Sequence, residues 1–193
     1  MNSLKKLLYI ILFYLPVCLY GQTQVTYKLA YNFGTQTYTV SMKSNIAMNP
    51  PLSIMTSSTQ VSLVVPHVAG GFQITNITPL TAVTWSNPPA NLDGTTLGLT
   101  NDYKFFAPTN SVAIAIPANT YLDLFSFKSG SGCLGDISLY DNINDPLNAF
   151  PSYNADNNMV ILAAGSGNIY IGNDSGNIPC TLPCSAAAGT LSY

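Results

Sequence analysis

The sequence contains no arginine and no glutamate, and charged residues make up only 7% of it. All six of its cations are lysines, and all eight of its acids are aspartates. Because proteins that bind nucleic acids neutralise phosphates with clustered lysine and arginine, this composition excludes nucleic acid as a partner. The hydrophobic content of 47% is enough for a packed core, which argues against an intrinsically disordered chain.

Histidine occurs only once, as His67, directly after Pro66. A serine or cysteine triad would need this histidine as its base, yet the sequence has no Gly-x-Ser-x-Gly motif and no acid that can be assigned to His67. A glycoside hydrolase needs two cooperating carboxyl groups, and the sequence shows no such pair of acid and base. We therefore expect a protein that is not an enzyme, with His67 in a turn or at a strand edge.

The first 21 residues have the layout of a secretory signal peptide. Lys5 and Lys6 form a short basic region, residues 7–19 are apolar, and Gly21 is small enough for a signal peptidase. The apolar segment is shorter than the about 20 residues that a membrane-spanning helix needs. This pattern predicts export, cleavage after Gly21 and no membrane span.

Lipoprotein processing at Cys18 is the alternative, although Val17 is bulky where that signal favours a small residue. No other segment is apolar enough to span a bilayer. Loss of the signal peptide would leave four lysines against eight aspartates, so the exported chain would carry a net charge of −4. We expect a secreted protein that is associated with the cell surface.

Apolar and polar residues alternate along most of the remaining chain, as they do in half-buried β-strands. Residues 24–43 predict a β-hairpin, because two alternating segments flank the turn-forming residues 32–35. Prolines fall between the alternating segments, where a missing backbone N–H is tolerated. Further strands are predicted at residues 60–65, 71–77, 82–86, 103–106, 111–116, 121–128, 136–140, 159–163 and 168–171.

These short strands predict an all-β fold, a sandwich of two antiparallel sheets with about nine or ten strands. No segment keeps a helical periodicity for more than about two turns. We expect the sandwich to span residues 22–178. Residues 179–193 include small, flexible residues and predict a linker or the start of a further domain.

Several segments carry a resemblance to a known family. Residues 124–128 read Leu-Phe-Ser-Phe-Lys, and residues 132–137 and 141–146 follow with Gly-Cys-Leu-Gly-Asp-Ile and Asp-Asn-Ile-Asn-Asp-Pro. Together with residues 35–40 and 61–66, they resemble the cohesin-like, carbohydrate-binding-module-like β-sandwich of bacterial surface proteins. The resemblance covers about residues 24–175 and implies a jelly-roll sandwich that acts in adhesion, scaffold assembly or glycan attachment. It implies no catalytic residues, and a fold alone does not assign a partner.

Aromatic residues on or near the predicted strands are candidates for stacking against sugar rings. We name Trp85, Tyr103, Phe105 and Tyr121 as candidate ligand-binding residues. Phe105 and Phe106 are adjacent, so they point to opposite faces of a strand, and one of them is exposed unless another segment covers it. The alternative is that these rings belong to the core, because a sandwich core needs aromatic residues.

Oxygen-bearing side chains are concentrated between residues 136 and 145. Calcium binds six to eight oxygen ligands, which makes Asp136, Asp141, Asn144 and Asp145 candidate ligands of a structural calcium ion. Their spacing is not that of an EF-hand loop. The alternative is that they form Asx-turns, in which Asp and Asn side chains bond to their own backbone. We expect no other cofactor.

Three cysteines follow the predicted signal peptide: Cys133, Cys180 and Cys184. Cysteines of exported chains usually pair, and three cannot all pair within one chain. A bond between Cys133 and Cys180 would close a long loop, whereas one between Cys180 and Cys184 would constrain little. We expect the Cys133–Cys180 disulfide, with Cys133–Cys184 as the alternative, and a partner of Cys184 beyond residue 193.

Taken together, these features predict a non-catalytic extracellular binding module for cell-surface adhesion or scaffold assembly. Its partner would be an extracellular protein or a polysaccharide. A carbohydrate-binding module that recognises a polysaccharide is the first alternative. A secreted hydrolase is the second alternative, and it is disfavoured because no acid and base are paired in the sequence.

Overall fold

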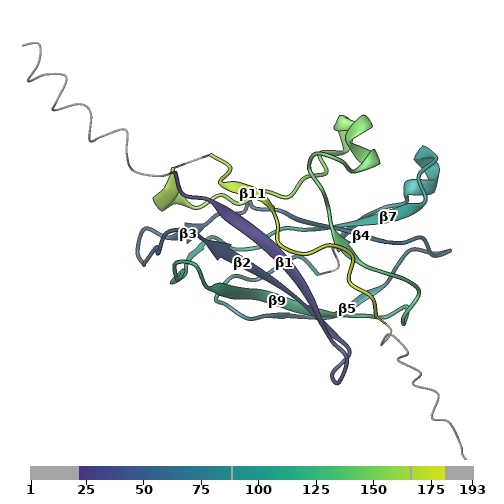
Figure 1. Ribbon diagram of the computed structural model, residues 1–193, viewed down its shortest axis with the longest axis horizontal. Coiled ribbons are helices and arrows are strands. Elements are labelled where there is room, and N and C mark those ends of the chain that lie inside the picture. Colours follow the sequence, from purple (N-terminus) through teal and green to yellow (C-terminus); the bar gives the residue numbers. More distant parts are fainter. Residues whose placement is uncertain (1–21, 88, 166, 181–193) are drawn as a thin grey trace, which may run out of the picture.

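The computed structural model describes residues 22–87, 89–165 and 167–180 (Figure 1). The predicted signal peptide, with Cys18, and residues 181–193, with Cys184, lie outside these described residues. Within them, eleven strands form three sheets, and the helical segments are short 3-10 turns. The prediction of an all-β fold is therefore confirmed. None of the helical turns in the described part of the chain is long and apolar enough to cross a membrane.

The largest sheet contains β1 (Val25–Asn32), β2 (Thr37–Ser44), β5 (Ile74–Pro79), β9 (Tyr121–Ser129) and β11 (Tyr170–Asn173). Its strand order is β11-β1-β2-β9-β5, and β1 and β2 form the predicted hairpin, with Asn32 opposite Thr37 beside the turn. The Asn32 side-chain oxygen accepts the backbone N–H groups of Gly34 and Thr35 at 2.9 and 3.1 Å. These two bonds fix the turn and therefore the register of the hairpin.

The second sheet contains β4 (Val61–Pro66), β6 (Ala90–Leu92), β7 (Asn101–Phe106) and β10 (Ser138–Leu139), in the order β10-β4-β7-β6. A third sheet of two strands pairs β3 (Ile54–Met55) with β8 (Val112–Ala113). The 3-10 turns are η2 (Gly94–Leu97), η3 (Pro146–Ala149), η4 (Pro151–Tyr153) and η5 (Leu162–Ala164). In Figure 1, β4 and β7 lie above and to the right of β1, β2 and β9.

The main hydrophobic core lies between the two larger sheets. Phe106 of β7 and Phe125 and Phe127 of β9 are fully buried, and the ring centroid of Phe106 lies 4.9 Å from that of Phe125 and 5.8 Å from that of Phe127. Tyr38 of β2 stacks on Phe127 at 5.1 Å. Burial of each such side chain contributes about 1.5–3 kcal/mol. Alternate residues of these strands face this core, which explains the period of two in the sequence.

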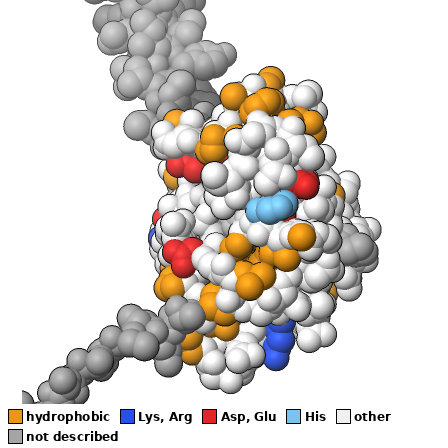
Figure 2. All heavy atoms as spheres, turned by 90° about the vertical axis from the view of Figure 1, so that its right-hand side faces the viewer, with side chains coloured by type: hydrophobic (Ala, Val, Ile, Leu, Met, Phe, Trp, Pro, Cys, Tyr) orange, Lys and Arg blue, Asp and Glu red, His pale blue; other side chains and the backbone are white. Residues whose placement is uncertain are grey.

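A smaller hydrophobic cluster covers the other face of the second sheet. It centres on Tyr103, Tyr140 and Leu147, all of which are buried, and Phe105 and Phe150 pack against it. The segment with η3 and η4 supplies Leu147 and Phe150 and so covers β7 from outside. Charged groups on the molecular surface are sparse and scattered, as Figure 2 shows for one face.

Two predicted strands are wrong. Val83 and Trp85 alternate and are buried as expected, but residues 82–86 form only an isolated bridge between Trp85 and Pro108. Met159 and Ile161 are also buried, yet residues 159–163 form only an isolated bridge between Ile161 and Met55 and enter η5. In both segments the alternation of apolar and polar residues predicted correctly which side chains are buried, but the backbone does not pair as a strand.

Two further differences concern strand pairing. The strands β3 and β6 were not predicted, because two or three residues are too few to show alternation. β11 runs parallel to β1, with Val25 opposite Tyr170, where antiparallel pairing alone was predicted. The two-sheet arrangement holds for the larger sheets, and the β3–β8 pair adds a third.

Candidate functional site

A cleft of about 430 Å³ lies between the loop that follows β10 and the segment formed by β11 and the residues after it. We call it the polar cleft. Amide, hydroxyl and carboxylate groups line it, together with the apolar side chains of Ile143 and Ile171. Its polar side chains include those of Asp141, Asn142, Asn144, Tyr170, Asn173 and Asn177.

Asp141 organises the loop that forms one wall of the polar cleft. One of its carboxylate oxygens accepts the backbone N–H groups of Ile143 and Asn144 at 2.8 and 3.1 Å, and the other accepts the Asn144 side-chain amide at 2.9 Å. This is an Asx-turn, in which a side chain replaces a backbone turn partner. The Asn144 amide and the Ile143 N–H lower the pKa of Asp141, which is therefore ionised near neutral pH.

Asn157 supports this loop from beneath. It is fully buried, and its side-chain amide donates to the Tyr140 carbonyl at 2.8 Å while its side-chain oxygen accepts the N–H of Ser62 at 2.7 Å. Its backbone N–H and carbonyl both bond to the Asn142 side chain, at 2.7 and 2.8 Å. These bonds attach the loop to β4, so this wall of the cleft is rigid.

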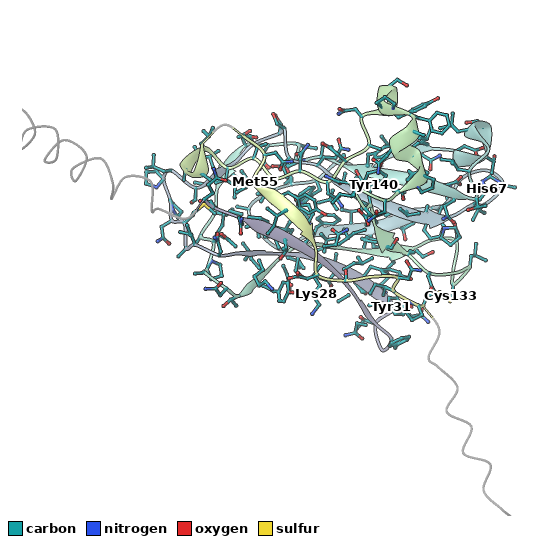
Figure 3. All side chains as sticks on the ribbon, turned by 45° about the horizontal axis from the view of Figure 1, so that its top comes forward. Lys28, Tyr31, Met55, His67, Cys133 and Tyr140 are labelled. Atoms are coloured by element: carbon teal, nitrogen blue, oxygen red, sulfur yellow. A yellow bond between two sulfur atoms is a disulfide. The ribbon has the colours of Figure 1, made fainter. Side chains whose placement is uncertain are left out.

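The opposite wall comes from β11. The Tyr170 hydroxyl donates to the Asn173 side-chain oxygen at 2.6 Å, and the Asn173 amide donates to the Tyr140 carbonyl at 2.9 Å. The Tyr140 carbonyl (Tyr140 is labelled in Figure 3) therefore accepts one bond from Asn157 beneath the loop and one from Asn173 in β11. Burial raises the pKa of Tyr170 to about 12, so its phenol stays neutral under physiological conditions.

Several groups of the cleft are open to a ligand. Asn177 is exposed, and within the described residues no side-chain hydrogen bond involves its amide. Ile143 and Ile171 are 83% and 57% exposed, which gives the polar cleft an apolar rim. Asp141 and Tyr170 are the two ionisable side chains of the lining, one charged and one neutral. Such a lining suits binding through hydrogen bonds and apolar contacts.

Of the candidate calcium ligands, the structure brings three into one turn. Asp141 and Asn144 bond to each other, and the Asp145 N–H donates to the Asp141 carbonyl at 3.2 Å. One Asp145 carboxylate oxygen accepts the Tyr103 hydroxyl and the Leu147 N–H, both at 2.9 Å, and so caps η3. Asp136 is exposed on the segment before β10. These contacts are those of the Asx-turn alternative.

The candidate aromatic residues do not share one surface in the described structure. Trp85 is only 5% exposed and lies against Phe125 in the main core, and Tyr103 is 1% exposed in the smaller cluster. Phe105 is half-buried against that cluster, so another segment does cover it. Tyr121 alone is partly exposed on the largest sheet. The alternative that these rings serve packing therefore describes Trp85 and Tyr103.

Tyr121 belongs to a charged network on the outer face of the largest sheet. The ammonium groups of Lys28 (labelled in Figure 3) and Lys43 lie 4.7 and 4.9 Å from its ring centroid. Its hydroxyl donates to the Asp174 carboxylate at 2.7 Å, and Lys43 bonds to the same oxygen at 2.6 Å. Cation–π contacts of this kind stabilise by about 0.5–1 kcal/mol at exposed sites.

The polar cleft was missed by reasoning from the sequence. Asp141 and Asn144 were singled out as calcium ligands, but Asn173 and Asn177 lie in a polar segment that indicated only turns. His67 follows β4 directly, and its Nδ1 atom lies 2.9 Å from an Asp102 carboxylate oxygen, an acid that the sequence did not assign to it. Comparison with protein-family models, curated proteins and solved structures gives no match to this chain.

Proposed function

We propose that this chain is a non-catalytic binding module that acts outside the cytoplasm and holds a saccharide in the polar cleft. The observation that carries the proposal is the lining, in which amides, hydroxyl groups and one ionised carboxylate surround about 430 Å³. Ligand sites in proteins have volumes of about 300–1,000 Å³. Sugar hydroxyl groups donate and accept hydrogen bonds, and a side-chain amide offers both functions at one position.

The ionisation of the lining supports binding over hydrolysis. A glycosidase needs a carboxylic acid whose pKa is raised so that it can protonate the leaving group. The pKa of Asp141 is shifted the other way by the Asn144 amide and the Ile143 N–H. Asp141 is therefore suited to accept hydrogen bonds from a ligand and not to donate a proton to it.

Export is part of the same proposal. The basic and apolar segments of residues 1–21 support a signal peptide that is cleaved near Gly21. The disulfide between Cys133 and Cys180 supports an oxidising compartment, where such bonds persist. Association with the cell surface would place the polar cleft where it meets extracellular polysaccharides.

An extracellular protein is the second candidate for the partner. Ile143 and Ile171 expose large apolar side chains at the rim of the cleft, and exposed apolar groups are typical of protein contacts in adhesion or scaffold assembly. A sugar ring also uses such groups, because one of its faces presents C–H bonds. The experiment therefore has to separate the two partners.

Glycan arrays, followed by calorimetry with the best ligand, test the proposal. We expect Asn177→Ala to weaken saccharide binding about tenfold, the loss of roughly one hydrogen bond. Ile143→Ala should weaken it as well, because it removes an exposed apolar contact. Matched controls are Asn87→Ala and Leu52→Ala, since both residues are exposed and neither lines the polar cleft.

Three results would contradict the proposal. Equal binding by Asn177→Ala and Asn87→Ala would show that the saccharide does not use the polar cleft. Capture of a defined extracellular protein, lost in Ile143→Ala while no array glycan binds, would favour the second candidate. Turnover of any polysaccharide by the purified protein would show that the module is catalytic.

A further inference from the structure

Three potential metal ligands meet at one end of the second sheet. His67 follows β4, Asp93 precedes η2, and Asp102 lies in β7. The pairing of β4 with β7 brings them together, because Val65 lies opposite Asp102 and Pro66 opposite Asn101. His67 (labelled in Figure 3) lies at the surface, where its atoms are pale blue in Figure 2, and its side chain is 36% exposed. None of the three residues lines the polar cleft.

The donor atoms of these residues have the spacing of metal ligands. His67 Nδ1 lies 2.9 Å from Asp102 Oδ1 and 3.5 Å from Asp93 Oδ1, and all three ligand atoms lie within 4.8 Å of one another. Nitrogen and oxygen ligands bind zinc at about 2.0–2.2 Å, so two ligands of a tetrahedral ion are roughly 3.3 Å apart. A metal ion would draw the three atoms together by a small movement of the exposed His67 and Asp93 side chains toward the buried Asp102.

Neighbouring groups hold both carboxylates in place. Asp93 Oδ1 accepts the N–H and the hydroxyl of Thr95 at 2.9 and 2.6 Å, and Asp102 Oδ1 accepts the Gly94 N–H at 3.2 Å. A Cβ atom on Gly94 would lie 1.9 Å from the Asn101 carbonyl oxygen, so only glycine allows this approach of the loop to β7. Hydrogen bonds to ligating carboxylates of this type orient metal ligands and raise affinity.

Asp102 gives an independent indication that a cation belongs here. It is fully buried, and its Oδ2 atom is buried without a hydrogen-bond partner in the described structure. Lys104 is buried on the same face of β7, but among the described residues no ion pair joins it to Asp102. A buried carboxylate oxygen without a partner is costly, and the His67 contact satisfies only Oδ1. A cation bound by the carboxylate would compensate the charge on both oxygens.

We propose that His67, Asp93 and Asp102 form a binding site for one divalent transition metal ion of the zinc type. Two carboxylates and a neutral imidazole carry a charge of −2, which one such ion neutralises. Imidazole nitrogen as a ligand favours zinc, cobalt or nickel over calcium and magnesium, which bind oxygen. Three protein ligands leave one coordination position toward solvent for water or for a donor atom of a partner.

The ion would link three parts of the fold. It would join the end of β4, the loop before η2 and the start of β7, adding to the backbone pairing of β4 with β7 and to the hydrogen bonds that hold the loop. Because it needs no sugar in the polar cleft, the site does not depend on the proposed function.

Calorimetry with ZnCl₂ on the untagged, chelator-treated protein tests the proposal. We expect one zinc ion per chain, a rise in Tm on binding, and an absorption band in visible light when Co²⁺ replaces Zn²⁺ at a site of low coordination number. Asp93→Asn and His67→Gln should each weaken zinc binding at least about tenfold. Asp136→Asn, which changes an exposed aspartate that is not one of the three ligands, is the matched control and should bind zinc as the parent does.

The variants keep the test decisive. Asp93 is 46% exposed, so Asp93→Asn should fold even if a change at the buried Asp102 does not. Absence of zinc binding by the parent protein at about 100 µM metal would overturn the proposal. Binding that persists unchanged in both Asp93→Asn and His67→Gln would also overturn it, because the ion would then lie elsewhere.

Discussion

Cys133, in the segment between β9 and β10, is bonded to Cys180, which lies 47 residues further along the chain. The bond attaches the segment that follows β11 to the segment between β9 and β10, close to the backbone bridge between Ile137 and Ile178. This pairing was the one expected from the sequence, and it is confirmed. Cys184 lies outside the described residues, so its predicted partner stays a prediction.

Removal of this disulfide should destabilise the fold. Closing a loop of 47 residues restricts the unfolded chain, and loop-closure entropy for that length amounts to about 4 kcal/mol. We expect the Cys133→Ser/Cys180→Ser double variant to lose roughly 2–4 kcal/mol of unfolding free energy in urea titrations. Cys184→Ser is the control and should keep the parent value. Peptide mapping that finds Cys180 joined to Cys184 would refute this account.

Truncation of Phe127 should open a cavity in the main core. The ring is fully buried, stacks on Tyr38 and lies beside Phe106. Phe127→Ala should lower the unfolding free energy by about 3–5 kcal/mol. Phe33→Ala, which changes a ring that is 38% exposed, is the matched control and should cost far less. Equal losses in the two variants would mean that the sheets do not pack through this ring.

Acid should weaken the network around Asp174. Burial raises the pKa of this carboxyl, but hydrogen bonds from Lys43, Tyr121 and Thr26 outweigh burial and hold the pKa below its ordinary value of 3.8. A depressed pKa in the folded state gives stability that is present above the unfolded pKa and is lost as pH falls through the folded pKa.

The measurement is the Tm of the parent and of Asp174→Asn between about pH 6 and about pH 2. The parent should be the more stable protein near pH 6, and the difference should shrink below about pH 4 as Asp174 becomes protonated. Asp136→Asn is the control, because within the described residues its carboxylate takes part in no ion pair. A difference that stays constant down to pH 2 would show that the Asp174 charge contributes nothing.

Calcium should change the stability of the protein little. The Asp141 and Asp145 carboxylates already accept hydrogen bonds from their own loop and from Tyr103. A calcium site with a Kd a hundredfold below the free calcium concentration would add about 2.7 kcal/mol and raise Tm by several degrees. Chelator titration should show no such rise. A rise that Asp141→Ala or Asp145→Ala abolishes would favour a calcium site over plain turns.

The sequence predicted those strands whose side chains alternate between core and surface. β1, β2 and β9 were found because residues such as Leu29, Val40 and Phe127 face the core at a period of two. The same alternation misled at Trp85, because a buried side chain does not require a paired backbone. Burial can therefore be predicted from local pattern more reliably than strand pairing.

The two sites could not be predicted in the same way. Asp141 and Asn177 meet across the polar cleft only because β11 returns to β1, and His67 meets Asp102 only through the register of β4 and β7. No local spacing indicates such contacts. The isolated His67 suggested a turn, and only the pairing of Pro66 with Asn101 shows which acids surround it.

The parallel pairing of Val25 with Tyr170 has a kinetic consequence. One edge of β1 has no strand partner until the chain has been made as far as β11, so this sheet cannot be completed before residues 170–173 have been synthesised. Contacts between residues so distant in sequence slow folding, because the intervening loop must be closed before they stabilise the structure. For the export proposed above, late folding would keep the chain unfolded for longer, and an unfolded chain is the form that a secretion channel accepts.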